Sequence, residues 1–297
     1  MLVKSLKLLD NTQVPWMAFG TGSALYKQDC TDACRLALSV GFNHLDTAQM
    51  YENEDAVGRA IASPGVPRES LYITTKLGAI PPGQTVEDTL RESLKKLQVE
   101  YVDLFLVHVP TQHTGREGGL KQVWKEMVDA KKTGLTRSIG VSNFNKSYLQ
   151  EVISAGLEKP VVNQIEYHPL VASRLAPLLA YMRVQGITVA SYGTLSPILP
   201  QRTANESIKP VIAQLTATLD KLAQTRGTSV THNQILFKWL HAQQAIAVTT
   251  SNKETRLKEN LAAESLADLT AEEITAIEDS VAGAHYRVFP MSFMDDN

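Results

Sequence analysis

The stretch His44-Leu45-Asp46-Thr47-Ala48-Gln49-Met50-Tyr51 gives the first indication of the fold. It begins as a short apolar strand that follows the turn Gly41-Phe42-Asn43. The strand ends in the carboxylate of Asp46, and the phenol of Tyr51 comes five residues later, just before a predicted helix. A carboxylate and a phenol delivered together at a strand end indicate proton chemistry, provided that the rest of the chain supplies partners.

Composition narrows the class of protein. The chain has 297 residues and a net charge of −2 with dispersed charges, which favours neither nucleic acid nor an acidic membrane as a partner. No apolar run approaches the roughly 20 residues that span a bilayer. Lys4 and Lys7 interrupt the N-terminus too early for a signal peptide, so we expect a cytoplasmic protein. The spacing of Cys30 and Cys34 on a predicted helix fits reduced, buried thiols.

Strands and helices alternate along most of the chain. A hairpin is predicted first, with strands at Ser5–Leu9 and Gln13–Pro15 around the turn Asp10-Asn11. Eight further strands are predicted at residues 17–19, 44–45, 71–75, 101–107, 138–141, 161–165, 187–190 and 245–248. Helices are predicted at residues 29–40, 54–62, 85–97, 120–132, 146–155, 175–184, 208–225, 230–241 and 255–262. A last helix begins after Thr270, which forms a capping box with Glu273.

This alternation predicts an α/β fold with a parallel sheet covered on both faces. We expect a (β/α)₈ TIM barrel that occupies residues 1–297 as a single domain, with the N-terminal β-hairpin and two extra helices. An open doubly wound sheet is the alternative. It is disfavoured because Gly20-Thr21-Gly22 is too short for a dinucleotide-binding Gly-x-Gly-x-x-Gly and has no helix opening on it.

Polar residues stand where the predicted strands end, and in such barrels the chemistry lies at the C-terminal ends of the strands. These ends carry Asp46, Tyr51, Lys76, His108, Ser142, Asn143, Gln164, Glu166 and Tyr192. Ordinary solvated strand ends would carry a mixture of Lys, Glu and Gly. We therefore expect these side chains to converge on one catalytic rim.

Four of the residues have complementary chemistry. A lysine ammonium close to a phenol lowers the pKa of the phenol, so Lys76 would make Tyr51 a better acid. Asp46 would keep Lys76 charged, and a neutral His108 would donate a hydrogen bond to a substrate oxygen. The set predicts an acid that protonates an oxygen while another group delivers a nucleophile or a hydride.

This set resembles that of the aldo-keto reductases, and the resemblance extends over the whole chain. Asp46-Thr47-Ala48-x-x-Tyr51 resembles the first signature of the family, and Gly140-Val141-Ser142-Asn143-Phe144 resembles the second. Val248-Thr249-Thr250-Ser251, continuing through Arg256 and Glu259-Asn260, resembles the third. Three motifs in order form a specific signal, whereas a lone Asp-x-Ala would be weak.

The resemblance implies a barrel that binds NADPH across its rim and reduces a ketone or aldehyde. It makes Tyr51 the general acid, with Lys76 and Asp46 tuning it and His108 orienting the carbonyl group. It assigns the nicotinamide half of NADPH to Ser142, Asn143, Gln164 and Tyr192. It assigns the 2′-phosphate to Ser251, Asn252 and Arg256, and the adenine to the neighbourhood of Glu259 and Asn260.

Two departures from the family pattern bear on specificity. The phosphate motif usually has a lysine before the serine, and this chain has Thr250 there; Arg256 keeps NADPH as the expected cofactor. Tryptophans typical of many reductases of aromatic aldehydes are replaced by Gly22-Ser23 and Thr111. In these features the chain is more similar to fungal α-keto amide and conjugated polyketone (ketopantoyl lactone-type) reductases. An α-dicarbonyl, α-keto ester, α-keto amide or keto lactone is therefore the expected substrate.

Other functions stay open at this point. One is a non-catalytic NADPH-binding sensor or partner subunit of the same fold, and another is a barrel hydrolase. Glu166 invites comparison with retaining glycosidases, but these need a second carboxylate about 5 Å away, and Asp46 is better explained by Lys76. The remaining histidines are scattered and predict no metal site. No long apolar helix face lacks a partner, so we expect a monomer.

Overall fold

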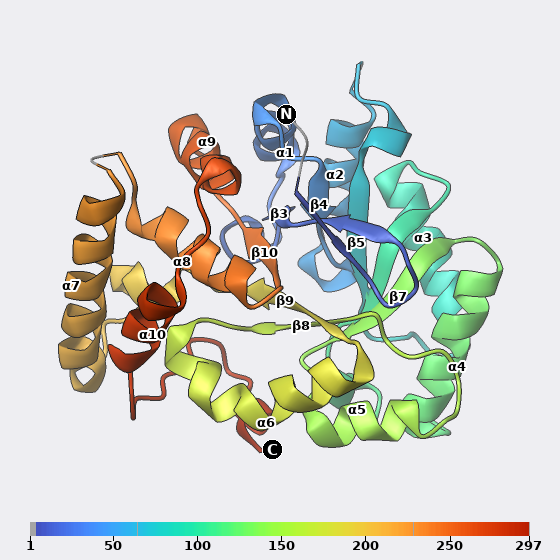
Figure 1. Ribbon diagram of the computed structural model, residues 1–297. Coiled ribbons are helices and arrows are strands. Elements are labelled where there is room, and N and C mark those ends of the chain that lie inside the picture. The colour runs from blue at the N-terminus through green and yellow to red at the C-terminus, as the bar shows by residue number, and fades with distance from the viewer. Residues whose placement is uncertain (1–3, 64, 228, 297) are drawn as a thin grey trace.

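Eight parallel strands close into a barrel at the centre of the computed structural model, which describes residues 4–63, 65–227 and 229–296 (Figure 1). The strands are β3 (Met17–Gly20), β4 (His44–Asp46), β5 (Tyr72–Leu77), β6 (Val102–Val107), β7 (Thr136–Ser142), β8 (Val162–Glu166), β9 (Thr188–Tyr192) and β10 (Ile246–Thr249). They are hydrogen-bonded in chain order, and β10 pairs with β3 to close the ring. The predicted TIM barrel is confirmed.

Helices surround the strands (Figure 1). They are α1 (Thr31–Val40), α2 (Glu54–Ile61), α3 (Val86–Leu97), α4 (Gly119–Lys132), α5 (Lys146–Ile153), α6 (Pro169–Gln185), α7 (Lys209–Arg226), α8 (His232–Ala242), α9 (Glu254–Ala262) and α10 (Ala271–Asp279). β9 is followed by both α7 and α8, and β10 by both α9 and α10, which gives the two extra helices predicted. The capping box of Thr270 and Glu273 starts α10 as expected.

The strands are buried on both faces, and the one charged residue inside β6 has specific partners. Every residue of β5 and β6 is buried. Asp103 accepts a hydrogen bond of 2.8 Å from the backbone of Ile73, and it pairs with Arg68 at 2.7 Å and Arg137 at 3.1 Å. A buried carboxylate with this many donors is compensated, so it does not interrupt the apolar strand.

The N-terminal hairpin covers the end of the barrel at which the strands begin. It pairs β1 (Ser5–Lys7) with β2 (Gln13–Pro15), and Leu8 and Val14 pack against residues at the starts of the strands, including Tyr72 and Val162. His44 also lies inside the barrel, where its Nε2 contacts Thr74 Oγ1 at 2.8 Å. Burial lowers the pKa of His44 to about 4, so it is a neutral core histidine.

Two segments differ from the sequence prediction. α6 begins at Pro169 rather than Leu175, because a proline in the first turn is already in helical geometry and needs no N–H partner. The segment between the strand predicted at 187–190 and the helix predicted at 208–225, for which no element was predicted, contains short 3₁₀ helices at Ser196–Ile198, Pro200–Arg202 and Glu206–Ile208. Cys30 and Cys34 are free and buried, as expected. No helix in the described parts of the chain combines the length and the apolar character needed to cross a membrane.

Candidate active site

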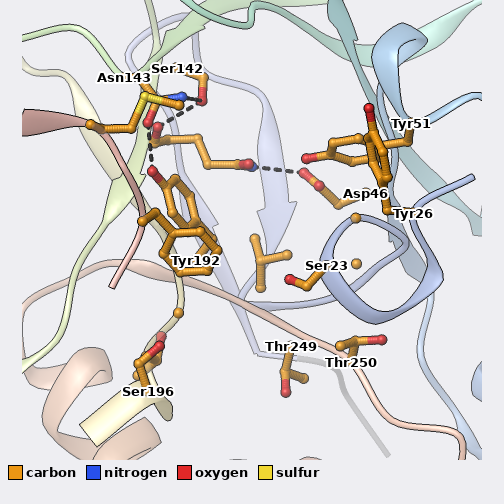
Figure 2. Close-up of a pocket in the computed structure, with 18 of the residues that line it drawn as sticks. Ser23, Tyr26, Asp46, Tyr51, Ser142, Asn143, Tyr192, Ser196, Thr249 and Thr250 are labelled. Carbon is orange, nitrogen blue, oxygen red and sulfur yellow. Dashed lines mark hydrogen bonds between the residues drawn. The ribbon is translucent and has the colours of Figure 1, made fainter. Parts of the chain in front are cut away.

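A cavity of about 320 Å³ opens at the C-terminal end of the barrel (Figure 2). Its walls come from strand ends, from the β9–α7 connection and from the C-terminal tail at residues 289–291. The sequence-predicted residues that line it are Asp46, Tyr51, His108, Ser142, Asn143, Gln164 and Tyr192. The convergence expected from the strand ends is therefore present.

Lys76 and Asp46 form a buried ion pair behind the cavity wall. Lys76 Nζ donates to Asp46 Oδ1 at 2.6 Å, to the backbone oxygen of Thr47 at 2.8 Å and to Tyr51 Oη at 3.4 Å. The side chains of Lys76 and Asp46 are 0% and 4% exposed, so water does not screen their attraction. Burial lowers the pKa of Lys76, but the charges and hydrogen bonds of Asp46 and Tyr51 together outweigh it, and the net shift is upward. The ammonium therefore stays charged beside the phenol.

The phenol of Tyr51 behaves differently from the sequence-based expectation. Burial raises the pKa of Tyr51, while Lys76 lowers it, and the net shift is upward. Lys76 acts in the predicted direction, but the prediction that the phenol becomes more acidic than a free tyrosine was wrong because the ring is buried. At neutral pH Tyr51 is a protonated hydrogen-bond donor, and its proton is available to an oxygen in the cavity.

His108 lies against Tyr51 with their ring centroids 5.4 Å apart in an edge-to-face arrangement. Burial, with a smaller contribution from the charge of Lys76, lowers the pKa of His108 to about 3. The imidazole is therefore neutral at physiological pH, as the sequence argument required. Its Nδ1 is buried and has no partner among the described residues.

Gly22 is a component of the site that the search for polar strand ends missed. A Cβ atom at this position would lie 3.0 Å from Cζ and 3.2 Å from Oη of Tyr51. Real Cβ atoms are rarely this close to another atom, so any larger residue would press on the phenol. The absence of a side chain at Gly22 thus lets Tyr51 occupy its position.

The opposite wall is held in place by the turn after β7. Asn143 has φ of 59°, a left-handed conformation that asparagine tolerates better than most residues. Its Oδ1 accepts a hydrogen bond of 2.7 Å from Tyr192 Oη, and its Nδ2 donates to the backbone oxygen of His108 at 3.0 Å and to Ser142 Oγ at 3.1 Å. This network fixes the ring of Tyr192, which faces Tyr51 and Asp46 across the cavity in Figure 2.

Gln164 connects the two walls. Its Nε2 donates to Asp46 Oδ2 at 2.8 Å, across the barrel from β8 to β4. Asp46 therefore has one oxygen on Lys76 and the other on Gln164, so both oxygens are fixed. The sequence predicted both residues at the rim but gave no indication of this contact.

Comparison with known proteins identifies the family of this chain. Residues 16–282 match the model of the aldo/keto reductase family. The chain belongs to this family. Aldo-keto reductases use NADP(H) and act on small carbonyl compounds, and this chain is an enzyme of that class.

Several relatives of this aldo-keto reductase match over nearly their whole length. The NAD/NADP-dependent indole-3-acetaldehyde reductase of Schizosaccharomyces pombe is 34% identical over 291 residues, which cover 96% of this chain and 97% of the relative. The methylglyoxal reductase of Escherichia coli O157:H7 is 36% identical, with 88% of this chain and 91% of the relative covered. The crystal structure of a Bombyx mori aldo-keto reductase in complex with NADP has a TM-score of 0.83 and 30% identity, covering 100% of this chain and 98% of that one.

In this aldo-keto reductase Glu166 anchors the C-terminal tail. The buried carboxylate accepts hydrogen bonds from the backbone of Val288 at 2.7 Å and of Phe289 at 3.4 Å, contacts His168 at 3.0 Å and pairs with Arg287 at 3.1 Å. Its acceptor oxygens are thus engaged by the tail and His168, which leaves nothing to favour a glycosidase role. The tail that it holds brings Phe289 to the cavity wall.

The residues that the resemblance assigns to the adenosine half of the cofactor lie beyond this cavity. Ser251 is half-buried, and Asn252 and Arg256 are exposed, on the segment that leads from β10 into α9. Glu259 accepts a hydrogen bond of 2.8 Å from Thr231, and the buried Asn260 donates to Thr249 Oγ1 at 3.3 Å. None of these five is among the described residues that line the cavity.

Thr250 connects the cavity to that segment. It lines the cavity next to Thr249, and its buried hydroxyl oxygen has no hydrogen-bond partner in the described residues. A free polar group at this place suits a polar ligand that extends from the cavity along the start of α9. No group of three or more His, Cys, Asp or Glu among the described residues is arranged to hold a metal ion.

Proposed function

We propose that this aldo-keto reductase reduces a ketone or aldehyde with NADPH, and that Tyr51 donates the proton. The observation that carries the proposal is the buried contact of Lys76 with both Asp46 and Tyr51, next to the neutral His108. A protonated phenol and a neutral imidazole on one wall of a cavity supply two donors to a single carbonyl oxygen.

Each residue of this wall has a separate task. The Tyr51 hydroxyl and the His108 ring hold the carbonyl oxygen, and the Tyr51 proton neutralises the charge that develops on it. Lys76 stabilises the phenolate that remains, because its ammonium lies 3.4 Å from Tyr51 Oη. Asp46 keeps the ammonium in place. NADPH, when bound, supplies the hydride for the carbonyl carbon.

The opposite wall suits the nicotinamide half of the cofactor. Ser142, Asn143 and Gln164 offer polar groups for the carboxamide, and the fixed ring of Tyr192 offers a surface for stacking. Farther along, Ser251, Asn252 and Arg256 would take the 2′-phosphate, and Glu259 and Asn260 would lie near the adenine. Arg256 supports NADPH over NADH, since its guanidinium fork suits phosphate oxygens. The relative from Schizosaccharomyces pombe is named NAD/NADP-dependent, which fits some use of NADH when Thr250 replaces a lysine.

We further propose that the substrate is an α-dicarbonyl compound, an α-keto ester, an α-keto amide or a keto lactone. Gly22 and Ser23 line the cavity where many reductases of aromatic aldehydes carry a tryptophan, so no indole ring narrows this part of the wall. A relative named methylglyoxal reductase also supports this class, because methylglyoxal is itself an α-dicarbonyl compound. In this view the chain resembles the ketopantoyl lactone-type reductases in substrate preference.

The test combines cofactor titration with one substitution. Fluorescence titration with NADPH and NADH measures cofactor binding, and NADPH consumption is followed with a panel of α-dicarbonyl compounds and simple aromatic aldehydes. Tyr51→Phe should bind NADPH like the unaltered enzyme and lose about 100-fold or more of its turnover, because only the proton donor is removed. Retained turnover would refute Tyr51 as the acid, and a wide preference for simple aromatic aldehydes would refute the substrate class.

A further inference from the structure

Gln49 supports the short turn on which the proposed proton donor lies. It begins the 3₁₀ helix Gln49–Tyr51, directly after β4 and the residues Thr47 and Ala48. Met50 and Tyr51 line the cavity, whereas Gln49 is not among the described residues that do so. Its side chain instead contacts α3 and the residue that follows β5. Gln49 therefore connects the turn to two neighbouring elements of the barrel.

Both ends of the Gln49 amide are hydrogen-bonded. Its Oε1 accepts a hydrogen bond of 2.8 Å from the backbone N–H of Gly78, directly after β5. Its Nε2 donates to the backbone oxygen of Thr89 at 3.1 Å and to Ser93 Oγ at 3.1 Å, both in α3. Gly78 offers only a donor and Thr89 only an acceptor at these places, so the amide has one orientation that satisfies both.

The partners of Gln49 are shielded from water. Thr89 and Ser93 are 7% and 1% exposed, and Gly78 is buried. Water therefore does not replace the amide easily, and a residue without donor and acceptor at position 49 would leave the Gly78 N–H unpaired. The three bonds of Gln49 thus form a defined bridge between α3, the end of β5 and the turn.

The turn has little support of its own. Its internal backbone bonds run from Tyr51 to Ala48 at 3.0 Å and from Glu52 to Gln49 at 3.2 Å, as in a single 3₁₀ turn. Glu52, which follows it, has φ of 54° in the left-handed region. On the side away from α3, the backbone N–H of Lys27 donates to the Tyr51 oxygen at 2.9 Å. The Gln49 bridge is the matching support on the side of α3.

The contact between the phenol and the ammonium depends on where this turn lies. Tyr51 Oη is 3.4 Å from Lys76 Nζ, which is already long for a hydrogen bond. Lys76 cannot follow a displaced phenol, because its ammonium is held by Asp46 at 2.6 Å and by the Thr47 oxygen at 2.8 Å. A small shift of the turn away from Lys76 therefore breaks the contact.

We propose that Gln49 is a positioning residue, which holds the turn so that the Tyr51 hydroxyl stays beside Lys76 and can give its proton to the substrate. The inference rests on the proposed role of Tyr51 as the acid. Because Gln49 does not line the cavity, its loss should affect the proton-transfer step more than the binding of cofactor or substrate.

The first test replaces Gln49 with a side chain of similar length that makes none of the three bonds. Gln49→Met should lower kcat by about 10- to 100-fold, since a slightly misplaced catalytic group costs this much. The KM for an α-dicarbonyl substrate and the Kd for NADPH should change by less than about 3-fold. Gln150→Met, at an exposed position on α5, is the matched control. Equal kcat values for the two variants would overturn the inference.

Gln49→Glu adds a rescue that depends on pH. A protonated carboxyl group has an acceptor for the Gly78 N–H and a donor for α3, as the amide has, whereas an ionised carboxylate has no donor. Relative to the unaltered enzyme at the same pH, the kcat of this variant should exceed that of Gln49→Met at about pH 5.5, where protonation is favoured. A variant as slow as Gln49→Met from about pH 5.5 to about pH 8 would refute the role of these bonds. This profile also decides the question if Gln49→Met does not fold.

A structural measurement separates this inference from the function on which it rests. If Tyr51→Phe retains turnover, Tyr51 is not the acid and the proposed function fails. Crystal structures of the unaltered enzyme and of Gln49→Met then test the bridge without activity. The distance from Tyr51 Oη to Lys76 Nζ should increase from 3.4 Å in the variant, and an unchanged distance would overturn the inference.

Discussion

Replacing Lys76 with methionine tests whether the buried charges of Lys76 and Asp46 stabilise each other in the folded protein. Lys76 Nζ donates to Asp46, Thr47 and Tyr51, and a methionine keeps the length of the side chain but none of these bonds. Asp46 would remain buried with Gln164 as its single described side-chain partner. Removing one member of a buried pair typically costs about 3–5 kcal/mol, because the other charge is left uncompensated.

The structure allows this cost to be converted into a melting temperature. For 297 residues, an unfolding entropy of about 2.1 cal/mol/K per residue makes a loss of 3–5 kcal/mol equal to a Tm decrease of about 5–8 °C. Differential scanning calorimetry measures this directly. Lys132→Met is the matched control, because Lys132 is exposed and its pair with Asp129 should contribute less than about 1 kcal/mol.

A double-mutant cycle provides the decisive comparison. Asp46→Asn alone leaves Lys76 buried without its counter-ion, so it should also be strongly destabilising. Asp46→Asn with Lys76→Met removes both charges and should cost about 2–3 kcal/mol less than the sum of the single variants. Strictly additive losses, or a Lys76→Met variant as stable as Lys132→Met, would refute the view that the two charges stabilise each other.

Two further predictions concern protonation and packing. Because His44 and His108 have pKa values lowered from 6.5 to about 4 and about 3, the unfolded chain binds more protons than the folded one below about pH 6.5. Stability should therefore fall with decreasing pH, by up to about 3 kcal/mol per pH unit for the two groups together. Urea unfolding between pH 7 and pH 4.5 measures this slope, and a flat profile would contradict it. Gly22→Ala should displace Tyr51 and lower kcat by about 10- to 100-fold. Gly115→Ala, where a Cβ meets no described atom within 4 Å, should leave kcat unchanged, and equal kcat values for the two variants would contradict the role of Gly22.

The barrel and its polar rim were predictable because they follow from local patterns. Apolar runs between helices define parallel strands, and a polar residue that ends such a run must lie at the rim. Asp46, Lys76 and His108 were found in this way, without any knowledge of three-dimensional contacts. The family resemblance then gave each residue a role, and matching of the family model over residues 16–282 confirmed the family.

What the sequence could not predict depends on barrel closure and burial. The contact between Gln164 and Asp46 exists because β8 and β4 face each other across the barrel, which no spacing along the chain reveals. The upward pKa shift of Tyr51 depends on how completely the ring is covered. The attachment of the tail to Glu166 joins segments more than a hundred residues apart, as in the contact with Arg287.

Closure of the barrel also determines when the site can exist. The hydrogen bond from Trp16 to Ala245 spans 229 residues, and β10 completes the ring by pairing with β3. Bringing such distant segments together costs loop entropy before any contact compensates for it, which makes parallel barrels slow to fold. During synthesis a nascent chain that has not yet emerged past residue 249 lacks both the last strand and the tail. Ligand binding therefore cannot assist the early stages of folding, because the cavity is complete only when residues 289–291 have left the ribosome.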